Sequence, residues 1–262
     1  MRPPARIYLD VTNACPLRCL HCFSSAGNPL TGELSRREIG DLLDQIGAMK
    51  TPSLVIGGGE PLAREDIFDI LDDCLKRGVP TEMVTNGVLL DSIAARRLAA
   101  MNMPLRLSLD GVSAETHDAI RGAGAFQGAL RAATLLRGAG LSCLSIHFTV
   151  NRTNVQDLLK LPPFLHQLGI ENVVISAVKP KGRAKDNPDL LISPKMAPYV
   201  RHKIALISLS SSAQVRQYCD KNWRDFGCPG GHLKMGIAAE GKVTPCVFLA
   251  RECDRSANIR TR

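Results

Sequence analysis

The sequence predicts an α/β protein, a partial (β/α)6 barrel with a small C-terminal extension that contains a β-hairpin and a helix. Six short apolar segments with strand character alternate with longer segments of helical periodicity, which is typical of βα units around a parallel sheet. Gly78, Gly140 and Gly169 stand where the helices of this pattern should end. Six strands favour a partial barrel over a closed eight-stranded one, and ligands of such folds collect at the carboxyl ends of the strands.

The predicted elements alternate through the first 178 residues. Strands are predicted at 7–11, 53–56, 82–85, 105–109, 142–150 and 172–177, and helices at 35–49, 64–77, 91–101, 126–139 and 155–168. Ser35, followed three residues later by Glu38, forms a capping box at the start of the first helix. The order strand, helix, strand therefore repeats without interruption along this part of the chain.

The composition changes after residue 177. Residues 179–188 are polar, rich in turn formers and without periodicity, so they are expected to form a connecting loop. A helix is predicted at 194–210, and the remainder is short and rich in cysteine. We therefore expect a barrel domain at 1–178 and a second region at 179–262.

Composition and charge exclude several classes of protein. Of the 262 residues, 45% are hydrophobic and 22% are charged, which excludes disordered, collagen-like and coiled-coil chains. The net charge of +8 comes from scattered Lys and Arg, and aromatic residues make up only 4%, so a nucleic-acid-binding surface is disfavoured. No apolar run approaches the roughly 18 residues that span a bilayer. These features predict a cytoplasmic protein without a membrane partner.

Nine cysteines are an unusual number for such a chain. The count is odd and the cysteines cluster unevenly, which favours metal ligation over a disulfide framework. Cys74 and Cys143 lie among apolar neighbours and are expected to be small buried hydrophobic residues.

Cys15, Cys19 and Cys22 form a C-x3-C-x2-C loop directly after the first predicted strand. A structural zinc site uses four ligands, usually in paired C-x2-C units, whereas this loop offers three. Three thiolates on one loop suit a cubane iron–sulfur cluster in which one iron lacks a protein ligand. That iron would be open to a substrate or a cofactor.

Further motifs follow the later strands in order. They are Gly57-Gly58-Gly59-Glu60-Pro61-Leu62, Thr85-Asn86-Gly87, Ser108-Leu109-Asp110-Gly111 and Val150-Asn151. Together with the cysteine loop, these motifs resemble those of the radical S-adenosylmethionine (radical SAM) enzymes over about residues 5–178. The resemblance implies a [4Fe–4S] cluster on Cys15, Cys19 and Cys22, with SAM bound at its open iron.

The resemblance also implies a set of SAM contacts. Backbone at Gly58 and Gly59, with the region of Glu60, would hold the methionine amino group, because glycine lets the backbone approach a ligand closely. The other implied contacts are Thr85, Asn86, Ser108, Asp110 and Asn151. His21 stands where the family commonly has an aromatic residue near the adenine, and Arg121 resembles an arginine near the SAM carboxylate in peptide-modifying relatives.

Four of these residues also have a purely structural interpretation. Glu60, before Pro61, would serve as a carboxylate at a helix start, and Asp110 as the N-cap of a helix near Ser113. Arg121 would be a surface arginine, and His21 a residue that faces solvent. The sequence leaves both interpretations open.

A second cysteine group lies near the C-terminus. Cys228 and Cys246 flank a hairpin predicted at 237–243, and their C-x12-G-x4-C spacing resembles the opening of SPASM or Twitch extensions, which hold auxiliary iron–sulfur clusters. We expect a [4Fe–4S] cluster on Cys228, Cys246 and Cys253, with Cys219 available as fourth ligand. Zinc on Cys228, His232, Cys246 and Cys253 is the alternative.

The resemblance implies reductive cleavage of SAM to methionine and a 5′-deoxyadenosyl radical that removes a hydrogen atom from the substrate. The favoured substrate is a ribosomal peptide or a cofactor precursor, and the expected electron donor is a reduced flavodoxin- or ferredoxin-type protein. One alternative is dehydrogenation or epimerisation of a small alcohol or sugar. The alternative from another class is a basic iron–sulfur or zinc protein that binds nucleic acid, which would need a continuous basic patch.

Overall fold

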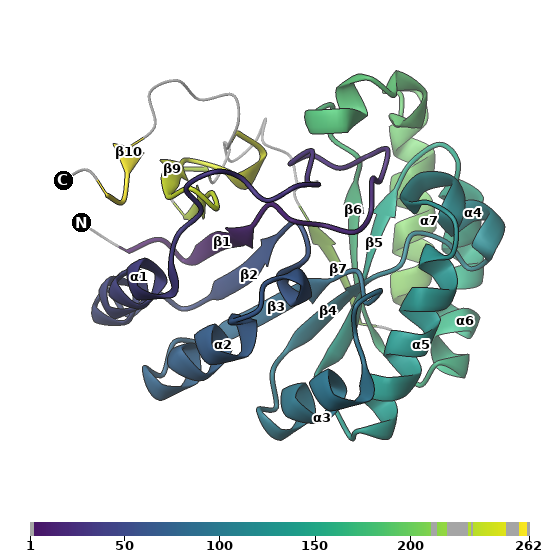
Figure 1. The fold of residues 1–262 in the computed structure, drawn as a ribbon. Helices are drawn as coiled ribbons and strands as arrows, with labels where there is room; N and C mark the ends of the chain where they lie inside the picture. The colour runs from purple at the N-terminus through teal and green to yellow at the C-terminus, as the bar shows by residue number, and fades with distance from the viewer. Residues whose placement is uncertain (1–2, 211–213, 219–229, 232, 250–256, 261–262) are drawn as a thin grey trace. The chain divides into compact units, whose positions relative to one another are not determined.

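The computed structural model describes residues 3–210, 214–218, 230–231, 233–249 and 257–260 (Figure 1). The chain divides into two compact units, each made of segments that are distant in sequence. The first comprises Met1–Pro16, Ala26–Thr85 and Gly227–Arg262, and the second comprises Leu17–Ser25 and Asn86–Phe226. Among the described residues, no helix is both long and apolar enough to cross a bilayer.

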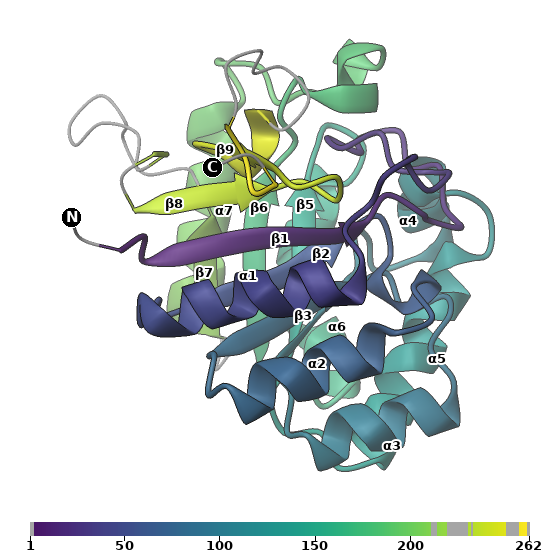
Figure 2. The same cartoon turned by 60° about the vertical axis from the view of Figure 1, so that its left-hand side comes forward.

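The first unit contains a mixed sheet whose strands lie in the order β10-β9-β8-β1-β2-β3. These strands are β1 (Arg6–Thr12), β2 (Leu54–Gly58), β3 (Thr81–Thr85), β8 (Lys234–Ile237), β9 (Lys242–Thr244) and β10 (Ala257–Asn258). The strands β8, β1, β2 and β3 are parallel, whereas β9 runs antiparallel to β8 and β10. Figure 2 shows β8 beside β1, so the predicted C-terminal hairpin extends this sheet.

Helices α1 (Arg36–Ala48) and α2 (Ile67–Lys76) lie side by side against one face of this sheet (Figure 2). Each buries an apolar stripe, with Leu43 and Ile46 on α1 and Ile70 and Leu71 on α2 almost fully covered. The capping box predicted at Ser35 is present. Burial of these stripes, at about 25 cal/mol per Å² of apolar surface, is the main contribution to the packing.

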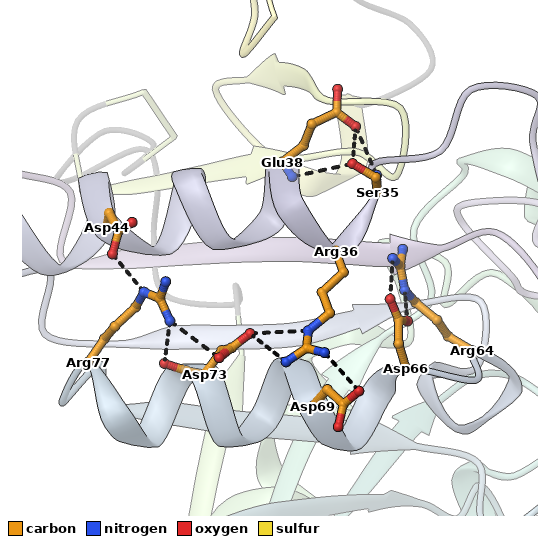
Figure 3. Close-up of polar contacts among 9 residues, drawn as sticks. All are labelled: Ser35, Arg36, Glu38, Asp44, Arg64, Asp66, Asp69, Asp73 and Arg77. Carbon is orange, nitrogen blue, oxygen red and sulfur yellow. Dashed lines mark hydrogen bonds and ion pairs between the residues drawn. The ribbon is translucent and has the colours of Figure 1, made fainter.

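Charged side chains connect the solvent-facing sides of α1 and α2 (Figure 3). Arg36 lies 3.0 Å from Asp69 and 3.4 Å from Asp73, and Arg77 lies 2.7 Å from Asp44. Exposed pairs of this kind contribute about 0–1 kcal/mol each. Arg64 has a different role, because its Nη1 donates to the carbonyls of Val11 (2.7 Å) and Leu34 (2.8 Å). It therefore ties the end of β1 to the segment that leads into α1.

The second unit contains four parallel strands in the order β4-β5-β6-β7. They are β4 (Leu105–Ser108), β5 (Leu144–Val150), β6 (Asn172–Ala177) and β7 (Gln214–Tyr218). The helices of this unit are α3 (Ser92–Ala100), α4 (Ala114–Arg121), α5 (Ala125–Gly138), α6 (Leu161–Gln167) and α7 (Ala197–Ser210). Leu107, Ile146, Phe148 and Ile175 are almost fully buried, so they form the centre of this unit's core.

The structure differs from the predicted elements at several points. The helix predicted at 155–168 is divided into a 3-10 helix (Val155–Lys160) and α6, because Pro162 and Pro163 lack an N–H and are tolerated only in a first turn. The loop predicted at 179–188 contains the 3-10 helix η3 (Gly182–Lys185) and the start of η4 (Pro188–Leu190). Strands β7 and β10 were not expected.

The two isolated cysteines have different environments. Cys74 is fully buried, as predicted. Cys143 is only partly buried, so that prediction is wrong, because its Sγ lies at the surface turn 3.3 Å from the carbonyl oxygen of Asn102. The division into regions 1–178 and 179–262 stays a prediction.

Candidate active site

The cysteine loop begins at the end of β1, in the first unit. Cys15 N–H donates to the carbonyl of Gly27 (2.8 Å), and Gly27 N–H donates to the carbonyl of Asn13 (2.8 Å). Glu33 accepts from Thr12 Oγ1 (2.8 Å) and from Asn13 N–H (2.7 Å). The backbone that leads up to Cys15 is therefore fixed before any ligand is bound.

The glycine motif after β2 packs against this same backbone. Gly59 N–H donates to the Thr12 carbonyl and Glu60 N–H to the Ala14 carbonyl, both at 2.8 Å. A Cβ at Gly59 would lie 2.2 Å from the Ala14 oxygen, and one at Gly58, whose φ is +120°, would lie 2.3 Å from the Thr12 oxygen. In the structure these glycines permit close approach to the backbone next to Cys15. Their predicted contact with the methionine end of SAM stays a prediction.

Glu60 is completely buried after β2. Its Oε1 accepts from Thr85 Oγ1 (2.6 Å) at the end of β3 and from Leu62 N–H (3.2 Å) at the start of the 3-10 helix η1 (Pro61–Ala63). The helix-start interpretation of Glu60 is therefore confirmed. The structure also joins Glu60 to Thr85, two residues that the sequence assigned to the same site from different strands.

Cys19 and Cys22 belong to the second unit. Leu20 N–H donates to the carbonyl of Ile120 on α4 (2.8 Å), which attaches this part of the loop to the helix. Cys19 is buried, and the Cys22 thiol lies 3.4 Å from Ser24 Oγ. Burial raises the pKa of the Cys19 thiol, while the nearby charge of Arg121 opposes that rise.

Asp110, just beyond β4, forms the charged centre of the second unit and is fully buried. Its Oδ2 lies 3.0 Å from His21 Nε2 and 2.6 Å from Arg121 Nε, and its Oδ1 accepts from Thr149 N–H (2.7 Å). Burial raises the pKa of this carboxyl, but the Arg121 and His21 interactions outweigh it and hold the pKa well below its usual range. Asp110 is thus a carboxylate that links the cysteine loop to α4 and β5.

The structure rules out the purely structural interpretations of these three residues, and their contacts to SAM stay predictions. Asp110 does not cap α4, because Ser113 is the N-cap and its side chain accepts from Thr116 N–H. Arg121 is not a surface arginine, since only 9% of it is exposed and its pKa is raised by Asp110 against the effect of burial. His21 faces Asp110 with a side chain 8% exposed, so it does not face solvent.

His117, on α4, completes the network and was not predicted. Its Nδ1 accepts from Asp110 N–H (3.0 Å), so the ring is a neutral acceptor at that nitrogen. Burial, followed by the charge of Arg121, lowers the pKa of His117 to about 4. The one sequence signal for His117 was its position one helical turn before Arg121.

The other predicted contacts lie at the carboxyl ends of strands or in the loops that follow them. Asn86 Oδ1 accepts from Val88 N–H (2.9 Å), and buried Asn151 donates its N–H to Asn154 Oδ1 (2.8 Å). Ser108 is buried at the end of β4, in register with His147 of β5. His147 Nε2 lies 2.9 Å from Ser176 Oγ, and burial, followed by the charge of Arg106, lowers the His147 pKa to about 3.

The donor set fits the iron–sulfur cluster that the sequence predicts. Within the described part of the chain, no three His, Cys, Asp or Glu side chains converge as ligands of a single metal ion. A cubane instead distributes its thiolates over separate irons, which suits three cysteines spread along one loop. His21 Nδ1 is buried and has no hydrogen-bond partner among the described residues, so a polar group remains available beside the loop.

The C-terminal cysteines are described only in part. Cys246 is partly buried between β9 and the 3-10 helix η5 (Val247–Leu249), and its carbonyl accepts from Thr244 Oγ1 (3.0 Å). Cys219, Cys228, His232 and Cys253 lie outside the described residues. The auxiliary cluster and the zinc alternative both stay predictions.

Comparison with known proteins connects this site to a family. A model of the Radical SAM superfamily matches residues 9–161. The mycofactocin maturase MftC of Mycobacterium tuberculosis is 37% identical over 184 residues, which are 70% of this chain and 47% of the maturase. The AdoMet-dependent heme synthase of Methanosarcina barkeri is 28% identical over 273 residues, which cover 94% of this chain and 77% of the synthase.

The crystal structure of Streptococcus suis SuiB bound to precursor peptide SuiA matches 98% of this chain and 63% of SuiB, with a TM-score of 0.83 and 16% identity. This likeness confirms the α/β partial-barrel fold. The chain spans about half the length of the curated maturase that it matches.

Replacement of Gly59 by Ala should weaken the fold next to Cys15. The added Cβ would meet the Ala14 carbonyl, and overpacking of this kind costs about 1–3 kcal/mol in the free energy of unfolding. Gly138→Ala is the matched control, because a Cβ there meets nothing within 4 Å. Urea denaturation of both variants under anaerobic conditions measures the difference. Equal midpoints would show that close packing does not require the glycine.

His117 should make the protein less stable in acid. The ring is neutral in the folded chain down to a pKa of about 4, whereas the unfolded chain binds a proton below about 6.5. The His117 contribution is therefore complete above pH 6.5 and decreases as the pH falls towards 4, by about 3 kcal/mol in total. His117→Gln should reduce the slope of unfolding free energy against pH in this window. An unchanged slope would contradict the assignment.

Proposed function

The chain belongs to the radical SAM superfamily, and on that premise we propose that it is a SAM-cleaving enzyme that abstracts a hydrogen atom from a ribosomal peptide or a cofactor precursor. The observation that supports this most strongly is the cysteine loop with its two attachments. Cys15 is fixed by the glycine motif of one unit, and Cys19 and Cys22 are fixed by the Asp110 network of the other.

Cys15, Cys19 and Cys22 are the residues that would hold the cluster, since their thiolates are the usual ligands of a cubane. When bound, the cluster and SAM together supply one electron and a carbon-centred oxidant for C–H cleavage, while the protein supplies placement and a dry site. The fixed backbone around Cys15 and the burial of Cys19 are what this chain contributes. Metal binding would displace the proton that burial otherwise keeps on Cys19.

We assign His21 to the nucleoside end of SAM. Asp110 faces His21 Nε2 at 3.0 Å and sets the orientation of the ring, which leaves buried Nδ1 available to a bound group. Asp110 then acts through His21, because both of its oxygens already accept hydrogen bonds within the protein. Arg121 stays the proposed residue near the SAM carboxylate, since its pairing with Asp110 at 2.6 Å uses only Nε. Glu60 and Thr85, which are hydrogen-bonded at 2.6 Å, would be the polar residues beside the methionine part of SAM.

Two sets of relatives support the substrate class. The maturase MftC and the peptide-bound SuiB structure favour a peptide. The heme synthase favours a cofactor precursor, and its match extends over 94% of this chain, including the C-terminal region. We retain both substrate classes and favour the peptide, because the maturase has the higher sequence identity to this chain. A reduced flavodoxin- or ferredoxin-type protein is the proposed electron donor.

We further propose an auxiliary [4Fe–4S] cluster on Cys228, Cys246 and Cys253, with Cys219 as a possible fourth ligand. The support is the position of Cys246, directly after a β8–β9 hairpin that pairs with β1. Gly241 adopts a φ of +86° in the turn of this hairpin, which explains the glycine in the C-x12-G-x4-C spacing.

Replacement of Cys15, Cys19 and Cys22 by Ala together should abolish SAM cleavage, because the cluster loses all its protein ligands. The measurement is 5′-deoxyadenosine formed after anaerobic reconstitution and reduction with dithionite. Cys143→Ala is the control, since this cysteine lies on a surface turn beside Asn102, is not a predicted ligand and should leave cleavage unchanged. Cleavage that persists in the triple variant would refute the assignment.

The same triple variant tests the auxiliary site. After reconstitution it should retain about four irons per chain if the C-terminal cysteines bind a cubane. Cys246→Ala in that background should then remove most of the remaining iron. Iron near zero together with about one bound zinc would establish the zinc site instead.

A further inference from the structure

The segment that follows β6 binds the backbone of the cysteine loop within the second unit. It comprises Lys181, the 3-10 helix η3 (Gly182–Lys185) and the residues through Asn187. We propose that this segment is a clamp that holds Cys19 and Cys22 in the geometry needed for cluster binding, with Gly182 and Arg183 as positioning residues. The inference rests on the proposed function and adds a role for a segment that the sequence predicts to be only a connecting loop.

Hydrogen bonds from the clamp reach three successive parts of the cysteine loop. Arg183 N–H donates to the carbonyl of Cys22 (3.0 Å), and Arg183 Nε donates to the carbonyl of Cys19 (2.8 Å). Asn187 Nδ2 donates to the carbonyl of Leu20 (3.3 Å). Arg183 is thus bonded to the backbone of both cysteines, although it lies 164 residues from Cys19. One side chain and one backbone N–H therefore fix two predicted ligands relative to each other.

The close approach at Gly182 is the steric part of the clamp. Gly182 has a φ of +54°, and a Cβ there would lie 2.3 Å from the Phe23 oxygen and 2.4 Å from the Cys22 oxygen. Both neighbours are backbone atoms, so no side-chain rotation can relieve the overlap. Any other residue at position 182 must either move the clamp away or displace Cys22.

The loop is also held from its other side. Leu20 N–H donates to the carbonyl of Ile120 on α4, and His21 binds Asp110. The Leu20 N–H is thus bonded to α4, whereas the carbonyls of Cys19, Leu20 and Cys22 are bonded to the clamp. Removal of the clamp would take these donors from three carbonyls and leave the Cys19–Cys22 backbone held mainly from the α4 side. Cluster sites depend on such surrounding contacts to orient their ligands.

Gly182→Ala tests the steric part, with Gly140→Ala as its matched control. Gly140 has a φ of +85° and an added Cβ meets nothing within 4 Å, so this variant also places an alanine at a positive φ but without the contact. The readout is the EPR signal of the reduced cluster, recorded with and without SAM. The quantity compared is the fraction of folded chains whose cluster signal changes when SAM is added. We expect Gly182→Ala to lower this fraction by about fivefold or more, and Gly140→Ala to match wild type.

Arg183→Met removes the side-chain hydrogen bond to the Cys19 carbonyl and keeps the backbone bond to Cys22. It adds no steric clash, so it remains informative if Gly182→Ala does not fold. Arg152→Met is the control, because the Arg152 side chain is half exposed and its ion pair with the exposed Asp189 is long, at 3.8 Å. We expect Arg183→Met to broaden and shift the cluster EPR signal and to lower the SAM-responsive fraction. Arg183→Lys keeps the positive charge and an N–H donor, so it should restore part of the SAM-responsive fraction.

The outcomes separate the clamp from the proposed function. If wild type, the two controls, Gly182→Ala and Arg183→Met all show the same SAM-responsive fraction, the clamp is overturned and the proposed function stands. Absence of such a cluster from wild type itself would overturn both the proposed function and the clamp. Loss of the signal in the two test variants, with thermal midpoints and circular dichroism like those of the controls, would support positioning of Cys19 and Cys22.

Discussion

The buried carboxylate of Asp110 is the interaction on which the organisation of the second unit depends. A charge with no solvent exposure is costly unless it is paired and hydrogen-bonded, and Asp110 has both kinds of partner. Arg121 supplies the counter-charge from α4, His21 the contact to the cysteine loop, and Thr149 N–H the contact to β5. Because each partner comes from a different element, a displacement of the loop would remove His21 from the partners of this buried charge.

The cysteine loop is held by different means at its two ends. In the first unit, the backbone next to Cys15 is held by hydrogen bonds from Gly59 and Glu60 and by the side chain of Glu33. In the second unit, the Cys19–Cys22 segment is held by α4, by His21 and by the segment around Arg183. Most of these contacts are to backbone atoms. Such an arrangement positions the backbone that carries the three thiols before a ligand is bound.

Local sequence signals predicted the elements and the motif positions, but not how side chains combine. Cysteine spacing and strand-end motifs placed Cys15, Gly59 and Asp110 correctly after strands, and the Ser35 capping box marked the start of α1. The Asp110–Arg121 pair joins residues 11 apart and the Arg183–Cys19 contact residues 164 apart, and neither separation follows from a helix or strand period. Pro162 and Pro163 did carry a local signal, since their missing N–H groups required a new helix start.

The central claim is that Cys15, Cys19 and Cys22 hold a cluster to which SAM binds directly. EPR spectroscopy of the dithionite-reduced, anaerobically reconstituted protein, recorded with and without SAM, tests it most directly. The account predicts that SAM shifts the g-values of one cluster signal, and that this signal is absent when the three cysteines are replaced by Ala. A spectrum that SAM does not change, or a SAM-responsive signal that survives loss of the three cysteines, would contradict it.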